Sequence, residues 1–324
     1  MSVTVSPAAT ALPIAAGEVL SAEARGYASR SSAENTRRAY RAAWADFTTY
    51  CDVAGVSPLP ASPETVGSYL AARAATVKAS TLALRLVAIR QAHRLAGHRL
   101  DTGHPAIRET VKGIRRTHGA AVAKKEAATT THLRDAVDRL AQAPGLRPLR
   151  DRAVLLVGFA AALRRSELVA LDVADLRFVA EGVVLTLRRS KTDTEGQGAE
   201  IAIPYGASDR TCPVLTLEAW LRAAAITAGA IFVSVTRHGR ATGTRLSDRD
   251  VARVVKAAVG AAGYAPEGFG GHSLRSGFIT SAARAGVAER SIQNQSRHKS
   301  LPVLRGYIRR GSLFMDNAAG RVGL

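Results

Sequence analysis

The chain has 324 residues, a formal net charge of +19 and a pI near 11.0, and 47% of its residues are hydrophobic. This composition is that of a globular protein with a substantial core, and the length favours two domains over one. Arginine and lysine are spread along the whole chain, which argues against a disordered basic arm and for a basic folded surface that binds nucleic acid. The alternative is a protein of high pI with no polyanionic partner.

Cysteine spacing and hydropathy indicate the compartment. Cys51 and Cys212 lie far apart without metal-ligand spacing, which predicts reduced thiols in a cytoplasmic protein. No run of about 18 apolar residues occurs, so no membrane span is expected. Residues 1–28 show no clear periodicity and lack the basic start of a signal peptide. They are predicted to form a loose N-terminal tail.

Residues 29–118 carry the pattern of four short amphipathic helices with arginines beside their apolar stripes. Ser62-Pro63-Glu64 places a capping residue, a proline and an acid at one helix start. Ser32, Ser80 and His104 mark the starts of the others. A helical bundle of this kind can bind DNA through arginine–phosphate contacts and a helix in the major groove. The same arginines fit an ordinary solvated surface equally well.

The remaining chain is predicted to form a linker and a second domain. Residues 119–129 lack an apolar stripe and are assigned to the linker, and residues 130–324 to the second domain, with a tail from about residue 312. Val183–Leu187 and Ala199–Pro204 have the β-branched or alternating residues of two strands flanking a polar hairpin. The other segments have helical periodicity. The predicted fold class is mainly α with a small antiparallel β-sheet (α+β).

Several residues of the second domain have side chains suited to phosphate chemistry. Arginine binds two phosphate oxygens with a rigid fork of donors, histidine transfers protons near neutral pH, and tyrosine can act as a nucleophile. Each type also has an ordinary structural use: a helical tyrosine usually packs, and a lysine in a polar turn is usually solvated. The candidates, in chain order, are Arg164, Lys191, His272, Arg275, His298 and Tyr307.

Short motifs around these candidates occur in a recognisable order. They are L-R-R-S-E-L with Arg164 and Glu167, the hairpin lysine Lys191, H-S-L-R with His272 and Arg275, R-H-K-S with His298, and L-R-G-Y with Tyr307. Each motif alone is weak. Together they resemble the tyrosine recombinase (phage integrase) family, in its Cre-like layout of an N-terminal helical bundle and a C-terminal catalytic domain. The resemblance implies that the bundle, residues 29–118, is a SAM-like core-binding domain that binds DNA. The resemblance covers about residues 130–310, with weaker support from the N-terminal half.

The resemblance implies that Tyr307 attacks a DNA phosphodiester, forms a 3′-phosphotyrosyl link and releases a 5′-hydroxyl. It implies that Arg164 and Arg275 bind the non-bridging oxygens and that His298 donates a hydrogen bond to the same phosphoryl group. The reaction of such an enzyme needs no ATP, because the tyrosyl link conserves the phosphodiester free energy. No metal and no other cofactor is expected, since arginines supply the positive charge.

Three further residues have supporting roles by the same resemblance. Lys191 would protonate the leaving 5′ oxygen, His272 would help take the tyrosine proton, and Glu167 would orient its neighbours. Two positions depart from the family pattern. Ala162 stands where glycine is usual in the first motif, and Arg297 replaces the glycine before His298. Arg297 is expected to bring additional charge beside the phosphate.

The family resemblance also implies partners. They are double-stranded DNA with a specific site, and further copies of the chain, monomeric or dimeric when free and tetrameric on two DNA sites. The tail from Ser312 is a candidate for docking on a neighbouring copy. Two alternative functions share the same scaffold or chemistry: a catalytically silent DNA-binding protein, and a nicking-closing enzyme similar to type IB topoisomerases.

Overall fold

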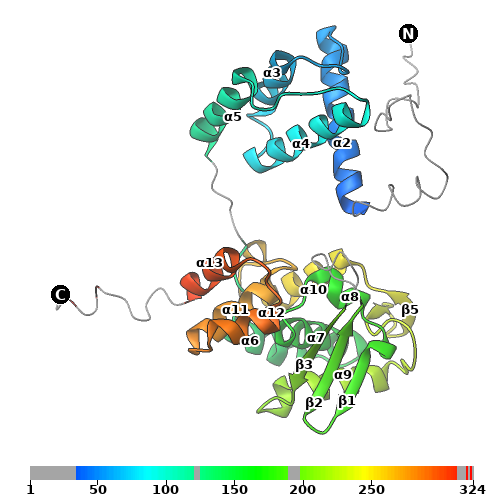
Figure 1. Cartoon of the computed structure of the whole chain (residues 1–324). Helices are drawn as coiled ribbons and strands as arrows, with labels where there is room; N and C mark the ends of the chain where they lie inside the picture. The colour runs from blue at the N-terminus through cyan, green and yellow to red at the C-terminus, as the bar shows by residue number, and fades with distance from the viewer. Residues whose placement is uncertain (1–33, 120–124, 189–197, 312–318, 320–321, 323–324) are drawn as a thin grey trace. The chain divides into compact units, whose positions relative to one another are not determined.

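The computed structural model describes residues 34–119, 125–188, 198–311, 319 and 322 (Figure 1). The chain divides into two compact units, Met1–Ala123 and Lys124–Leu324, which are described separately below. The N-terminal tail predicted for residues 1–28 lies outside the described residues. Over the described ranges, no helix is both long enough and apolar enough to cross a membrane.

The first unit is a bundle of four helices, as the periodicity predicted. They are α2 (Glu34–Ala54), α3 (Pro63–Arg73), α4 (Ala79–Leu95) and α5 (Pro105–His118). Ser62 caps α3, because its hydroxyl accepts a hydrogen bond from the Thr65 amide at 3.1 Å. The apolar sides of the helices meet in one core. Its buried residues include Trp44, Phe47, Cys51, Val66, Tyr69, Leu70, Leu82, Ile89 and Ile107.

One carboxylate joins three helices of this bundle. Asp46 on α2 accepts hydrogen bonds from the Tyr69 hydroxyl at 2.7 Å, from Arg85 at 2.7 Å and from Arg73 at 3.1 Å. The donors come from α3 and α4. Arg73 and Arg85 therefore belong to the internal packing of the bundle, a distinction between structural and solvated arginines that the sequence pattern left open.

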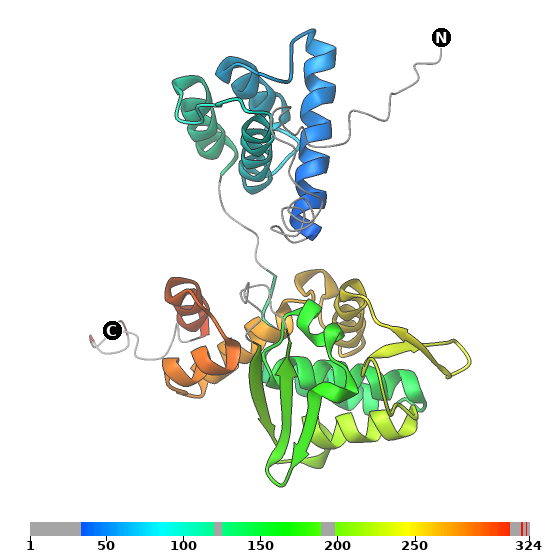
Figure 2. The same ribbon diagram turned by 45° about the vertical axis from the view of Figure 1, so that its right-hand side comes forward.

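The second unit is mainly helical. Its helices are α6 (Thr130–Ala141), α7 (Leu146–Ala160), α8 (Arg165–Ala170), α9 (Pro213–Ala223), α10 (Asp248–Ala261), α11 (Ser273–Arg284), α12 (Glu289–Ser296) and α13 (Leu301–Gly311). Helix α7 lies at the centre of the unit, with α6, α9, α10 and α11 packed around it (Figure 2). The consecutive residues Val154–Val157 are all buried, because neighbours surround α7 on every side.

Two small antiparallel sheets complete the second unit. The first has the order β1-β2-β3, formed by β1 (Leu176–Val179), β2 (Gly182–Leu187) and β3 (Ala199–Pro204). The second pairs β4 (Val233–Val235) with β5 (Ala241–Arg245). The predicted pairing of β2 with β3 is confirmed, with Val184 opposite Ala202. Strands β1 and β5 were not predicted, because they are short and lack alternation of buried and exposed residues.

The segment before α6 packs tightly on the helix that carries the H-S-L-R motif. Residues 125–129, which the sequence placed in the linker, belong to the second unit: the Ala128 amide donates to the Ser273 carbonyl at 2.9 Å. A Cβ atom at Gly277 would lie 1.9 Å from the Ala128 carbonyl oxygen. Glycine is therefore required at position 277, and this close approach fixes the position of α11.

Candidate active site

The first arginine motif forms the start of α8. Arg164 occupies the N-cap position, and its amide donates a hydrogen bond to Glu167 Oε2 at 2.9 Å. Its guanidinium also pairs with Glu167 Oε1. Burial acts to raise the pKa of Glu167, but the Arg164 amide and the charges of Arg297 and Arg164 outweigh it, and the pKa lies below its ordinary value. Glu167 is therefore an ionised, buried carboxylate that holds Arg164 in place.

The turn between α7 and α8 exposes a carbonyl toward the site. Ala162 has a φ of 47°, in the left-handed region that favours glycine, which accounts for the glycine usual at this position. An alanine in this conformation costs about 1–2 kcal/mol. The turn directs the Ala162 carbonyl to Arg275, whose Nη1 donates to it at 2.6 Å.

Arg275 is the most deeply buried cation of the site, with 1% of its surface exposed. It lies in the first turn of α11. Burial, together with the positive charges of Arg164 and Arg297, lowers the pKa of Arg275 to about 9, so the side chain stays charged at neutral pH. Its hydrogen bonds within the described residues go to the Ala162 carbonyl and to His298, and none goes to a carboxylate.

The contacts of His298 define which of its nitrogens carries a proton. Arg275 Nη2 lies 3.3 Å from His298 Nδ1, and the Ser296 hydroxyl lies 2.8 Å from the same nitrogen. A guanidinium can only donate, so Nδ1 is the acceptor. Burial, then the charges of Arg275 and Arg164, lower the pKa of His298 to about 4. The ring is therefore neutral at pH 7, with its proton on Nε2 as a donor for a ligand.

Tyr307 lies on α13 within reach of both histidines. Its ring centroid is 6.1 Å from that of His272 and 6.0 Å from that of His298. Its hydroxyl lies 3.0 Å from His272 Nε2. Helix α13 is held against α11 by a small apolar cluster that includes Ile279 and Leu304. This packing places Tyr307, 32 positions beyond Arg275 in the sequence, beside His272 and His298.

His272 is suited to accept the proton of Tyr307. The residue is exposed at its surface, yet surrounding protein atoms partly desolvate its ring. This desolvation and the charges of Arg275 and Arg164 lower the pKa of His272 below its ordinary value. At neutral pH the ring is unprotonated on one nitrogen. With Nε2 as that nitrogen, the 3.0 Å contact becomes a hydrogen bond from the tyrosine to a base.

The hairpin lysine is the one predicted site residue that the structure does not place. Lys191 falls in residues 189–197, outside the described ranges. The base of the hairpin is described: Arg188 donates to Asp175 at 2.6 Å, and Leu187 pairs with Ala199. The other predicted residues converge on one site. They are Arg164, Glu167, His272, Arg275, His298 and Tyr307.

Sequence reasoning assigned no role to three polar residues around α12. Ser296 contacts His298 Nδ1, and Gln293 donates to the His298 carbonyl at 3.0 Å. Gln295 donates to the Ala160 carbonyl at 2.9 Å and so joins α12 to α7. The serine and the two glutamines lie within five residues before His298. Their closeness to His298 in the sequence is the only feature that could have identified them as part of the site. The side chain of Arg297 also turns inward, where it forms an ion pair with Glu167.

Comparisons with known proteins match both units of the chain to one family. The phage integrase family model matches residues 103–311, and the model of its N-terminal SAM-like domain matches residues 27–99. An integrase/recombinase xerD homolog from Selenomonas ruminantium is 40% identical over 309 residues, covering 94% of this chain and 90% of the relative.

Solved structures share the fold at low sequence identity. XerH site-specific recombinase bound to palindromic difH substrate superposes with a TM-score of 0.67 and 14% identity, covering 90% of this chain and 81% of that chain. A lambda integrase tetramer bound to a Holliday junction gives a TM-score of 0.55 and 18% identity, covering 87% of this chain and 74% of that chain. On the family match and the 40% identical relative, the chain belongs to the phage integrase family and is a tyrosine recombinase.

Proposed function

We propose that this recombinase cuts and rejoins double-stranded DNA at a specific site through a 3′-phosphotyrosyl bond to Tyr307. One observation carries the proposal: Arg275 is buried and charged, and no carboxylate within the described residues pairs with it. A buried cation is costly unless an anion compensates its charge. A DNA phosphate between Arg275 and Tyr307 supplies that anion at the point where the nucleophile lies.

The proposed cleavage step uses the described contacts. The Tyr307 oxygen attacks phosphorus, and its proton passes to His272 Nε2 along the 3.0 Å contact. The bond from phosphorus to the 5′ oxygen breaks, and Lys191 protonates that oxygen. Arg164 and Arg275 bind the non-bridging oxygens, and His298 donates from Nε2. Attack by a 5′-hydroxyl on the phosphotyrosyl bond reverses these transfers and rejoins the strand without ATP.

Covalent capture of DNA tests the function. The wild-type protein is incubated with duplex fragments from the DNA flanking its gene, each nicked so that a cleaved strand diffuses away. Protein-linked fragments are recovered after denaturation and sequenced. Convergence on one site with inverted repeats is expected. Bound DNA without any adduct would instead favour a silent DNA-binding protein, and adducts without sequence preference would favour a topoisomerase.

Lys191 has the role of general acid in this scheme, and its replacement by alanine tests that role. K191A is expected to slow cleavage of ordinary DNA by about 100-fold or more, because a poor alkoxide leaving group must depart unprotonated. On DNA with sulfur in place of the bridging 5′ oxygen, the rate should return close to that of the wild type, since a thiolate leaves without protonation. The measurement is single-turnover cleavage of both substrates.

A contrasting variant makes the assay specific for the leaving group. R164A removes a clamp on the non-bridging oxygens, so it should be slow on both substrates. An equal loss in K191A on oxygen and sulfur substrates would show that Lys191 is not the proton donor.

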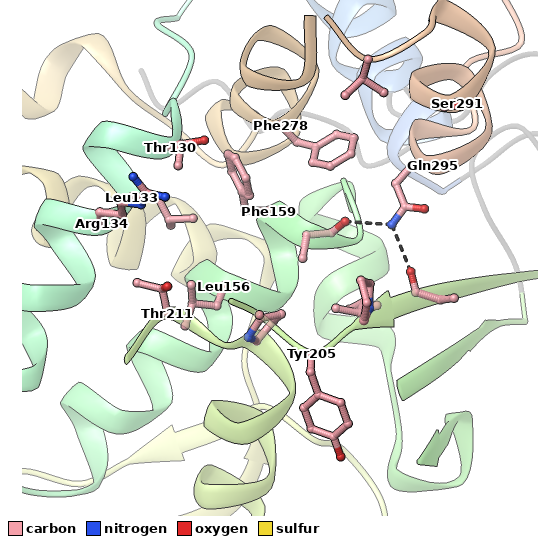
Figure 3. A pocket seen from close by; sticks show the side chains of 17 residues that line it. Thr130, Leu133, Arg134, Leu156, Phe159, Tyr205, Thr211, Phe278, Ser291 and Gln295 are labelled. Carbon is pink, nitrogen blue, oxygen red and sulfur yellow. Dashed lines mark hydrogen bonds between the residues drawn. The ribbon is translucent and has the colours of Figure 1, made fainter. Parts of the chain in front are cut away.

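We further propose that copies of the chain assemble on DNA through an apolar groove on the second unit. The groove has a volume of about 480 Å³ and opens between α6, α7, β3, α11 and α12 (Figure 3). Leu156, Phe159 and Phe278 contribute apolar side chains to its lining. The proposed occupant is the tail of a second copy, residues 312–324, which begins after the nucleophile helix and contains Leu-Phe-Met at 313–315. Lambda integrase, which shares the fold, is a tetramer on a Holliday junction, and this supports the assembly of several copies on DNA.

Removing residues 312–324 should leave binding to a single site intact and abolish the pairing of two sites. The apolar tail is then missing from the groove, although the DNA-binding surface is unchanged. A charge placed in the groove by V287D should have the same effect with the tail present. The masses of protein–DNA complexes, measured by sedimentation, distinguish these states. Unchanged four-copy complexes with both variants would refute the proposed contact.

A further inference from the structure

Arg297 stands in a backbone conformation that ordinarily selects glycine. It follows the last residue of α12 with φ 54° and ψ 41°, the left-handed geometry of a helix C-terminus. This left-handed backbone explains why glycine is usual before the histidine in the family motif. It does not explain an arginine, whose Cβ is disfavoured in this region. Contacts of the Arg297 side chain must therefore offset the unfavourable backbone conformation.

The Arg297 side chain runs inward and is 14% exposed. Its Nη2 donates to Glu167 Oε2 at 2.9 Å. Its Nη1 donates to the Gln295 carbonyl at 2.9 Å and to the Ala161 carbonyl at 3.2 Å. One guanidinium thus connects three parts of the second unit: the end of α12, the turn between α7 and α8, and the carboxylate that holds the first catalytic arginine.

The groups that Arg297 binds are shared with both phosphate-binding arginines. Glu167 Oε2, which accepts from Arg297, also accepts from the Arg164 amide at 2.9 Å. The Ala162 carbonyl, which Arg275 binds at 2.6 Å, lies 3.5 Å from Arg297 Nη2. His298 is the next residue in the chain. The backbone that carries His298 is therefore tied through Arg297 to the anchors of Arg164 and Arg275.

The ion pair also affects the charge available to a phosphate. With only Arg164 beside it, the Glu167 carboxylate would neutralise that arginine. Because Arg297 shares the carboxylate, the three guanidiniums and one carboxylate of the site retain a net charge of +2. A phosphoryl group undergoing attack accumulates negative charge on its non-bridging oxygens, so this surplus lies where it stabilises the transition state.

We propose that Arg297 is a positioning residue for strand cleavage: through its ion pair with Glu167 it aligns His298 with Arg164 and Arg275 and keeps Arg164 free to bind phosphate. This inference rests on the proposed cleavage function. It assigns a task to the residue that departs from the family motif, and it makes Glu167 a carboxylate shared by two arginines instead of a partner of one.

The decisive variant is R297G, because glycine suits the left-handed backbone and removes only the tether. Single-turnover cleavage should fall about 10-fold or more, while DNA affinity and the melting temperature stay near wild type. Guanidinium ion at millimolar concentration should restore part of the rate, and sodium at equal ionic strength should not. R297K should remain impaired, because an ammonium cannot reproduce the fork. R177A, which removes an exposed arginine paired with Glu200, serves as the charge-matched control.

A titration separates positioning from a general loss of structure. Arg297 is one of the charges that lower the pKa of His298, so its removal should raise that pKa, as measured by NMR on the His298 ring of the folded variant. Wild-type rates in R297G, or a loss without guanidinium rescue that follows the melting temperature, would overturn the inference and leave the function in place. Failure of the wild type itself to form an adduct would instead overturn the proposed function.

Discussion

Replacing Tyr307 by phenylalanine is expected to abolish covalent attachment to DNA and to leave DNA binding unchanged. The substitution removes one oxygen, the atom that lies 3.0 Å from His272 Nε2. The ring keeps its packing against α11, so the fold should be unaffected. Loss of a nucleophile lowers the rate at least about a thousandfold. The adduct is measured by denaturing gel with a nicked substrate, and binding by a native gel on the same DNA.

Another tyrosine of the second unit provides the control. Tyr264 donates its hydroxyl hydrogen bond to Asp135, away from the arginines of the site. Y264F removes the same atom type and should retain adduct formation. If Y307F also retained it, a different residue would have to be the nucleophile, and the assignment of Tyr307 would fail.

Replacing Arg275 by methionine is expected to separate activity from stability. Cleavage should fall by about 100-fold to 1,000-fold, because a preorganised donor to the phosphoryl oxygens is lost. The melting temperature should stay the same or rise, because the depressed pKa of Arg275, about 9, reflects the cost of burying its charge. At pH 7 the arginine is charged in both the folded and the unfolded chain, so this cost is present throughout the neutral range.

A ligand-induced shift in melting temperature tests the same residue without DNA. Inorganic phosphate should stabilise the wild type more than R275M, since the anion compensates the buried cation only when that cation is present. R275K keeps the positive charge but lacks the forked pair of donors of a guanidinium. It should therefore retain more of the stabilisation by phosphate than of the cleavage rate. A marked fall in the stability of R275M with equal phosphate shifts in both proteins would mean that Arg275 is a structural residue.

Much of the site was predictable because its chemistry is encoded in short local motifs. The H-S-L-R spacing places His272 at the start of α11 and Arg275 in its first turn. His298 and Tyr307 were assigned through the resemblance of their motifs to those of the family. The strands β2 and β3 were predictable from alternation. These features depend on residues close in sequence, where helix and strand periodicity have direct physical meaning.

What could not be predicted depends on contacts between distant segments. Arg297 and Glu167 are 130 residues apart, and only the tertiary fold of the second unit brings them together. In the first unit, Asp46 binds Arg73 and Arg85 from two other helices, and periodicity alone does not separate these arginines from exposed ones. A left-handed residue such as Ala162 is likewise set by its turn and not by its own preference.

The central claim, that Tyr307 carries the DNA, is tested most directly by locating the covalent bond. The adduct formed by wild-type protein is digested with nuclease and trypsin, and the peptides are analysed by mass spectrometry. The tryptic peptide Gly306–Arg309 contains Tyr307 as its only hydroxyl-bearing residue. A nucleotide 3′-phosphate on that peptide is the predicted result. The same mass on any other peptide, with Gly306–Arg309 unmodified, would contradict the account.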